Sequence, residues 1–262
     1  VDEEHRAHWE HIAANLRDYA TTVIDGENFE PVDHRIRATA HYTARDFPSG
    51  AVLVVYEGYP VIEYNLAPWI MPIFPSGEIG LHSPADQRER ALRTLQNTPY
   101  YLWDDLVMLS IAWVRLGHDP LDIFARHTQS ILHENGCQTY PRDSGHSHLI
   151  FMHFLGWPIA INETLVQSYT GHIRVAPVHL ERTACFARLR TTGAFLLGGE
   201  VAYLALTSEA GRLCKLVRPG DGPLRVCHFD SMEQVDVVEQ EGVLIFPTAV
   251  GATYVVDRPE ET

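Results

Sequence analysis

Residues that could do acid–base or ligand chemistry are concentrated in the loop of residues 136–157. Asp143 is followed there by three histidines, which are His146, His148 and His153. The HxH spacing can supply two metal ligands, but a metal site needs more, so Asp143 would have to fold back onto the pair. Carboxylate and imidazole groups can also act as general acids and bases or bind sugar hydroxyls. A polar loop whose histidines bind backbone groups is the simplest alternative.

A second candidate group lies in the loop of residues 57–80, where Glu63 and Asn65 precede Trp69. A sugar ring offers an apolar face and a rim of hydroxyls, so an aromatic ring beside a carboxylate and an amide suits it. Trp157, at the end of the first loop, is a second candidate stacking platform. Alternatively, Trp69 and the apolar residues after it simply cover the core.

Other signals in the sequence exclude several functional classes. The chain has 262 residues and a formal net charge of −14, which argues against a nucleic-acid partner. No apolar run approaches the roughly 18 residues that would span a bilayer, so no membrane partner is predicted. GxGxxG, Walker, HExxH and GxSxG motifs are absent, and we predict no cofactor and no bound metal. The four cysteines lack CxxC spacing and are expected to be buried structural thiols.

Residues 1–171 are predicted to be helical, with one long loop at residues 25–83. Periodic or capped helical patterns cover residues 3–20, 84–97, 99–117, 120–136 and 158–171. The three middle helices each follow an N-cap acceptor and a Pro, and Gly ends two of them. Pro158 opens the last helix and Gly171 is expected to cap it.

Two of these helices carry informative apolar patterns. The first helix has one stripe, made by Trp9, Ile12, Ala13, Leu16 and Tyr19. The helix of residues 99–117 is apolar around most of its circumference, which is typical of an inner helix between outer ones. The long loop contains one predicted strand, Ala51–Tyr56.

Residues 172–262 change to a period of two. Nine short runs rich in β-branched or aromatic residues begin near residues 172, 185, 194, 201, 213, 224, 234, 243 and 253. Gly or Pro-Gly turns separate several of them, a pattern that favours an antiparallel β-sandwich. The predicted fold class is therefore mainly α followed by β.

Two stretches resemble glycosidases related to glycoside hydrolase family 95, the 1,2-α-L-fucosidase group. One is FPSGEIGLHSP at residues 74–84, which is similar to the family segment FPGGQIGL. The other runs from residue 161 to residue 219 and resembles the family's C-terminal helix and the strands after it. The positions that fall on this pattern are Asn162, Glu163, Leu165, Gln167, Ser168, Gly171, Ile173, Pro177, Leu189, Arg190, Gly193 and Phe195.

The resemblance implies the last helices of a partial (α/α)₆ toroid in residues 1–171 and a C-terminal β-sandwich in residues 172–262. It implies that the N-terminal remainder of the same enzyme, with its general acid, is a partner of this chain. It also implies a carbohydrate substrate and a secreted or periplasmic protein, although the chain starts without a signal pattern. The family's Asp, in a motif like QIDGNFG, falls on Met152, beside His153.

These observations predict a glycoside hydrolase that inverts the anomeric centre with two carboxyl groups. Asp143 and Glu63 are the candidate catalytic residues. The candidate substrate-binding residues are His146, His148, His153, Trp157, Asn65 and Trp69. Two alternatives stay open, a non-catalytic carbohydrate-binding or structural module and a metal-dependent enzyme that uses the His-rich loop.

Overall fold

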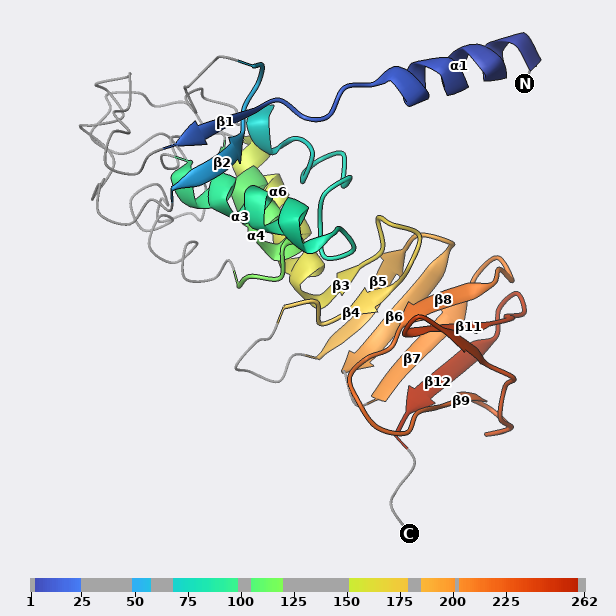
Figure 1. Cartoon of the computed structure of the whole chain (residues 1–262). Coiled ribbons are helices and arrows are strands. Elements are labelled where there is room, and N and C mark those ends of the chain that lie inside the picture. Colours follow the sequence, from blue (N-terminus) through green and yellow to red (C-terminus); the bar gives the residue numbers. More distant parts are fainter. Residues whose placement is uncertain are drawn as a thin grey trace, which may run out of the picture.

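The described helices all lie before residue 166 and the larger antiparallel sheets after it, as the sequence predicts, while one two-stranded sheet, made of residues 21–24 and 50–53, lies among the helices (Figure 1). The computed structural model describes residues 3–24, 49–57, 68–98, 105–119, 151–178, 185–200 and 203–258. Within these ranges, no helix is both long enough and apolar enough to cross a membrane.

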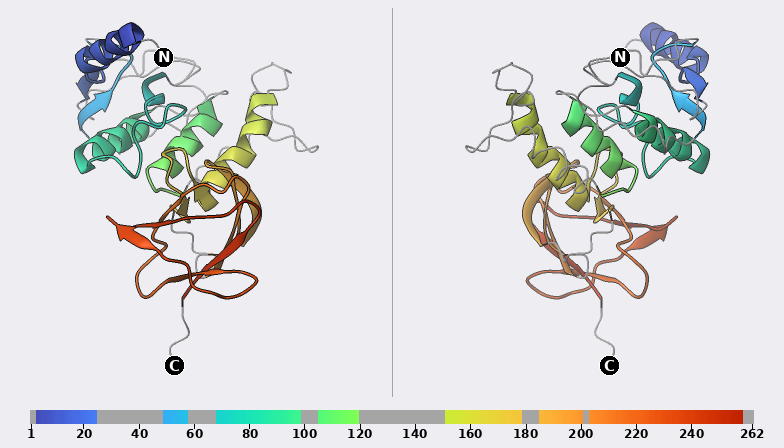
Figure 2. Two further views of the ribbon diagram at one scale, coloured as in Figure 1. Left: turned by 90° about the vertical axis from the view of Figure 1, so that its right-hand side faces the viewer. Right: turned by 90° about the vertical axis from the view of Figure 1, so that its left-hand side faces the viewer.

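The helix α4 is the centre of the helical part. The helices are α1 (Glu3–Asn15), α3 (Ala85–Asn97), α4 (Asp105–Arg115) and α6 (Phe151–Leu165), with a 3₁₀ turn η1 (Pro68–Ile70). On one side of α4, Leu109 and Ala112 join a core with α3 and the strand at residues 50–53. On another side, Val107 and Ile111 pack against α6. Figure 2 shows α4 between α3 and α6, so this helix is buried on more than one side, as predicted; the predicted helix of residues 120–136 lies outside the described residues.

The helix α6 begins earlier than the sequence predicts. It runs from Phe151 to Leu165 and contains Pro158 in its interior, so the predicted start at Pro158 is wrong. Proline there removes one helical hydrogen bond, but Trp157 and Ala160 on either side of it pack against Val107 and Ile111 of α4, and this packing offsets the loss. Gly156 supports this packing, since an added Cβ would lie 2.3 Å from a methyl group of Val107.

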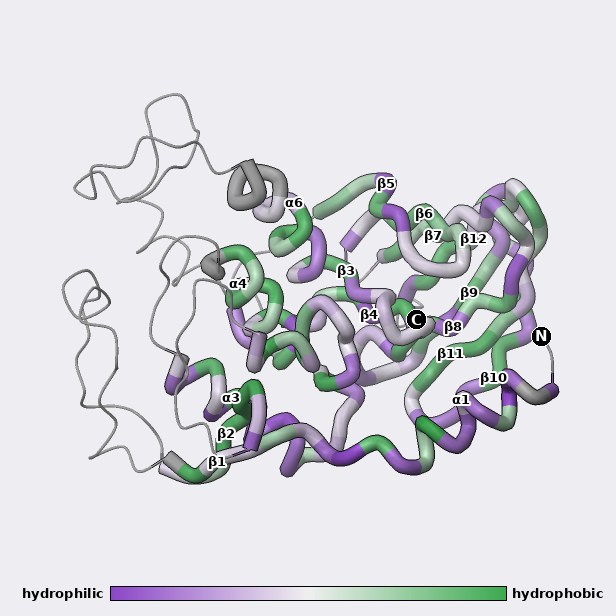
Figure 3. Tube along the Cα trace, turned by 90° about the horizontal axis from the view of Figure 1, so that it is seen from above, coloured by the Kyte–Doolittle hydropathy of each residue, from purple (hydrophilic) through white to green (hydrophobic). Residues whose placement is uncertain are grey.

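The helix α1 differs from its prediction in length and in burial. It ends at Asn15, and its apolar stripe is exposed, with Trp9 64% and Leu16 72% accessible. Figure 1 shows α1 extending away from the other described elements, and Figure 3 colours it mostly as hydrophilic. The stripe therefore meets no core in this part of the structure.

All named strands pair in antiparallel fashion. They are β1 (Thr21–Ile24), β2 (Gly50–Leu53), β3 (Val166–Gln167), β4 (Arg174–Val175), β5 (Phe186–Thr191), β6 (Phe195–Glu200), β7 (Tyr203–Ser208), β8 (Cys214–Val217), β9 (Arg225–His228), β10 (Val238–Gln240), β11 (Val243–Phe246) and β12 (Thr253–Asp257). The order β5-β6-β7-β12-β9 forms one sheet and β10-β11-β8 another. The strands β1 and β2 form one two-stranded sheet, and β3 and β4 form another, which we call the β3–β4 ribbon. Each of the nine strands predicted after residue 171 corresponds to an observed one.

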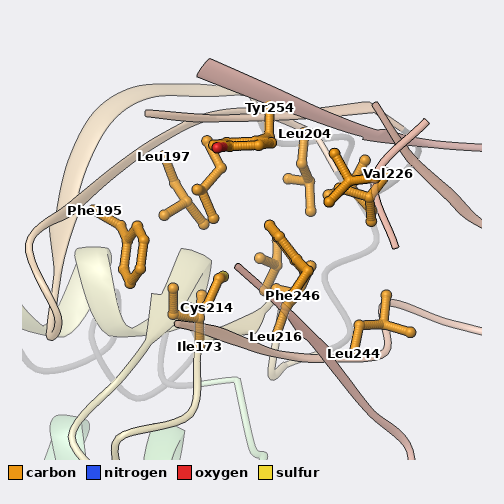
Figure 4. Close-up of a cluster of buried hydrophobic side chains, with 14 of the residues drawn as sticks. Ile173, Phe195, Leu197, Leu204, Cys214, Leu216, Val226, Leu244, Phe246 and Tyr254 are labelled. Carbon is orange, nitrogen blue, oxygen red and sulfur yellow. The ribbon is translucent and has the colours of Figure 1, made fainter. Parts of the chain in front are cut away.

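Side chains from the two larger sheets meet in one apolar core (Figure 4). Leu197 and Tyr254 come from the five-stranded sheet, whereas Leu216 and Phe246 come from the three-stranded one. Each of these four side chains is at most 1% exposed. The alternation of buried and exposed positions along the strands produces this core directly.

One edge of the five-stranded sheet is irregular. The pairing of β5 with β6 shifts register between Phe186 and Leu189, which marks a β-bulge. Arg188, inside the bulge, has a φ of 57°, and its side chain is exposed. At the opposite edge, Val226 of β9 accepts a backbone hydrogen bond from Val235, so a following segment covers that strand.

The segment from β3 to β4 joins the helices to the sheets. The Ile173 N–H donates to the carbonyl of Lys215 at 2.8 Å, and the Val217 N–H donates to the carbonyl of Ile173 at 2.7 Å. On its other side, the Thr192 hydroxyl donates to the carbonyl of Ser168 at 2.6 Å. Gly171 therefore turns the chain between two strands and does not cap α6 as predicted.

The thiols differ in accessibility, which gives a chemical prediction. Cys214 and Cys227 are buried, as expected, whereas Cys185 is exposed and corrects that expectation. Burial raises the pKa of Cys214 to about 12. Because the thiolate is the reactive form, iodoacetamide at mildly alkaline pH should label Cys185 and leave Cys214 and Cys227 unmodified. Peptide mapping checks this, and rapid native labelling of Cys214 would contradict the packing described.

Candidate functional site

A buried arginine at the end of α4 organises the junction between helices and sheets. The Arg115 guanidinium binds both carboxylate oxygens of Glu163, with Nη2 to Oε1 at 2.7 Å and Nε to Oε2 at 3.0 Å. The two side chains are only 6% and 14% exposed. Arg115 also donates to the carbonyl of Ile73 at 2.9 Å. A bidentate arrangement is the stronger geometry for a pair of arginine and carboxylate.

Two aromatic rings enclose the same guanidinium. Its central carbon lies 4.8 Å from the Phe74 ring centroid and 4.0 Å from that of Tyr169. Both distances fall within the range of cation–π attraction. We call Phe74, Gly77, Arg115, Glu163 and Tyr169 the Arg115 cluster. It holds the loop after η1, two helices and the β3–β4 turn together.

Glycines in the loop of residues 74–80 let Tyr169 pack closely. A Cβ added at Gly77 would lie 2.7 Å from the Tyr169 ring, and one at Gly80 would lie 2.3 Å from its hydroxyl oxygen. Gly77 also has a φ of 73°, which side chains rarely adopt. The Ser83 hydroxyl, predicted to cap α3, instead accepts from the Gly80 N–H at 3.1 Å. The loop therefore presents its backbone to Tyr169.

A small pocket opens beside the Arg115 cluster. It is lined by Leu81, His82, Gln167, Tyr169, Thr170, His172 and Arg174, and we call it the cationic pocket. Gln167 is buried and donates to the carbonyl of Val114 at 3.1 Å, which fixes β3 against the end of α4. The His82 ring meets the Tyr169 ring edge-on, with centroids 6.0 Å apart. Among the residues that line the pocket, none is a carboxylate.

The electrostatics of the pocket follow from burial and from the crowding of positive groups. Burial lowers the pKa of His82, against the opposing effect of the Glu78 carbonyl. The positive charges of Arg174, Arg115 and His172 lower it further. Burial also lowers the pKa of Arg174 and raises that of Tyr169. Arg174 and Tyr169 therefore present hydrogen-bond donors to the pocket, and Arg174 adds positive charge.

Most of the site residues predicted from sequence lie outside the described residues. These are Glu63, Asn65, Asp143, His146 and His148. His153 belongs to α6, whose backbone alone is described at that position. The structure therefore leaves their mutual positions as predictions.

The two predicted stacking platforms are buried in cores. Trp69 is 3% exposed, and its indole N–H donates to the Thr98 hydroxyl at 3.0 Å. Trp157 is 7% exposed and packs with Val107 and Ile111. Neither ring has an exposed face on which a sugar could stack, so that role does not fit this structure. Trp69 belongs to the core, as the alternative interpretation of this residue expected.

Sequence reasoning missed the cationic pocket. His172 and Arg174 alternate with the buried residues Ile173 and Val175, so they share one face of the strand. That alternation was a usable signal. The proximity of His82 to His172 and Arg174 could not be predicted from the sequence, because it depends on a contact between segments that are far apart in the chain.

Comparison with known proteins assigns no family to this chain. No protein-family model matches it, and no curated protein matches it in sequence. Within the described part of the chain, no group of three or more His, Cys, Asp or Glu side chains could hold a metal ion. The site is therefore interpreted from its own geometry.

Proposed function

We propose that this chain is the C-terminal portion of a glycoside hydrolase that acts on an oligo- or polysaccharide. One observation carries the proposal beyond the sequence pattern. The two stretches on which the family resemblance rests, residues 74–84 and 161–219, are far apart in sequence but pack together in the Arg115 cluster. Contact between them supports a shared structural origin, because unrelated chance similarities have no reason to meet.

The architecture is consistent with this proposal. Under this proposal, α3, α4 and α6 are the last helices of an (α/α)₆ toroid, with α4 as an inner helix. The proposal takes the five-stranded and three-stranded sheets, which share one apolar core, as the C-terminal β-sandwich. The exposed stripe of α1, with Trp9 and Leu16, is then a surface for the N-terminal remainder of the enzyme.

The proposed chemistry is acid–base hydrolysis with inversion at the anomeric carbon. Asp143 and Glu63 are the proposed carboxyl groups, and an inverting pair stands about 6.5–9.5 Å apart to admit a water molecule. His146, His148, His153 and Asn65 are proposed to bind sugar hydroxyls. The segment that carries Asp143 connects the end of α4 to the start of α6, and Arg115 lies at its α4 end.

The test uses the natural polypeptide that contains this chain. It is incubated with a panel of aryl glycosides and oligosaccharides, and the first-formed anomer is followed by proton NMR. Hydrolysis with inversion supports the proposal. Sugar binding without hydrolysis across the panel would favour the binding-module alternative, and stoichiometric zinc or iron by elemental analysis would favour the metal-dependent one.

A further inference from the structure

We propose that the cationic pocket binds an oxyanion, a carboxylate or sulfate group, and that the sugar recognised by this protein carries that group. The binding of an oxyanion follows from the pocket alone. Its assignment to a substituent of the sugar rests on the proposed function.

The first support is a set of donors that lack acceptors. Arg174 is half-buried, and among the described residues its guanidinium has no ion pair or hydrogen bond. The Tyr169 hydroxyl, beside it, has no hydrogen-bond partner in the same part of the chain, although its ring is held by Arg115. A partly buried donor without an acceptor lowers the stability of the folded protein unless a ligand or a water molecule accepts its hydrogen bond.

The second support is the balance of charge. His82 lies within electrostatic reach of Arg174, Arg115 and His172, and each of these positive groups opposes its protonation. The carboxylate of Glu163, which acts electrostatically on Tyr169, is engaged by Arg115. A local surplus of cations therefore remains in a chain whose net charge is −14. An anion would relieve this mutual repulsion.

The third support is the size and framing of the pocket. Its walls come from the loop at Leu81 and His82 and from the ribbon of β3 and β4, which Gln167 ties to α4. A small pocket with an arginine and a phenol suits a planar carboxylate or a sulfate group better than a whole sugar ring. The rest of the sugar would extend outward from it.

The experiment measures ligand binding to the full chain by isothermal titration calorimetry at constant ionic strength. The probes are sodium sulfate, glucuronate and neutral glucose. We expect sulfate and glucuronate to bind and glucose not to bind. Arg174→Gln should weaken binding of both anions about ten- to a hundredfold, as for loss of a hydrogen bond to a charged group.

Two further variants keep this test decisive. His82→Gln changes a partly exposed side chain in the lining of the pocket and should weaken anion binding with only a small change in the thermal midpoint, even if Arg174→Gln were poorly folded. Arg212→Gln, an exposed arginine outside the pocket, is the matched control and should bind as the parent does. Equal binding of glucose and glucuronate, or unchanged anion binding in both pocket variants, would overturn the proposal.

The outcomes also separate the two proposals. Hydrolysis of neutral glycosides without anion binding would leave the glycosidase standing and remove the oxyanion site. Binding of sulfate but not of glucuronate would keep the oxyanion site and exclude a carboxylate as the group that the sugar carries.

Discussion

Replacing Glu163 by Gln should lower the free energy of unfolding by about 3 kcal/mol, because breaking a buried ion pair leaves the other charge uncompensated. Arg115 would then keep its carbonyl contacts but lose both carboxylate oxygens. The amide of Gln can accept one hydrogen bond, but its Nε2 would face the guanidinium with a second donor. Urea unfolding followed by circular dichroism measures the change.

A chemically identical substitution at an exposed pair provides the control. Glu89 pairs with Arg93 one turn along α3, and the Glu89 side chain is 70% exposed. Glu89→Gln should therefore cost less than about 0.5 kcal/mol. The double variant Arg115→Met with Glu163→Met should recover part of the loss, since it buries no isolated charge. Equal effects of Glu163→Gln and Glu89→Gln would show that the Arg115 cluster does not stabilise the junction.

Replacing Asp143 by Asn in the natural polypeptide should lower kcat by about a thousandfold, within the range that general acid–base groups contribute. The amide keeps the size of the side chain but can neither lose nor donate the proton that the proposed mechanism needs. Steady-state kinetics on the best glycoside from the panel provide the measurement, with the unfolding midpoint as a check on folding.

The matched control is Asp230→Asn, at an exposed aspartate after β9, which should leave kcat unchanged. Glu63→Gln tests the second proposed carboxyl group in the same assay. A kcat within twofold of the parent for Asp143→Asn would remove Asp143 from the mechanism. A loss of kcat in the Glu63 variant alone would assign the catalytic role to Glu63, in the loop of residues 57–80.

The strands were predictable from sequence and the helix ends were not, for one physical reason. Strands such as β7, β8 and β11 alternate between buried and more exposed positions, and turns with Gly separate several of the strands, so a local pattern contains most of the information. Proline normally marks the first turn of a helix, but tertiary packing carries α6 through Pro158. The apolar stripe on α1 is likewise exposed because no described element packs against it, which a local pattern cannot reveal.

The site was less predictable than the fold because its parts come from distant segments. Arg115 and Glu163 are each ordinary charged residues within helical patterns, and only the contact between α4 and α6 pairs them. The same holds for His82 and Arg174, which the loop and the β3–β4 ribbon bring together. By contrast, the cluster of Asp143 with histidines was visible because its members are neighbours in the chain.

The bulge in β5 has a consequence for how this protein behaves at high concentration. An open strand edge is a template on which other molecules can add strands and aggregate. The shifted register at Phe186, and the exposed charges of Arg188 and Arg190, interrupt that template on one side of the five-stranded sheet. On the other side, the Val235 N–H already donates a hydrogen bond to the carbonyl of Val226 in β9. Both edges of the sheet are therefore protected against self-association without any further domain.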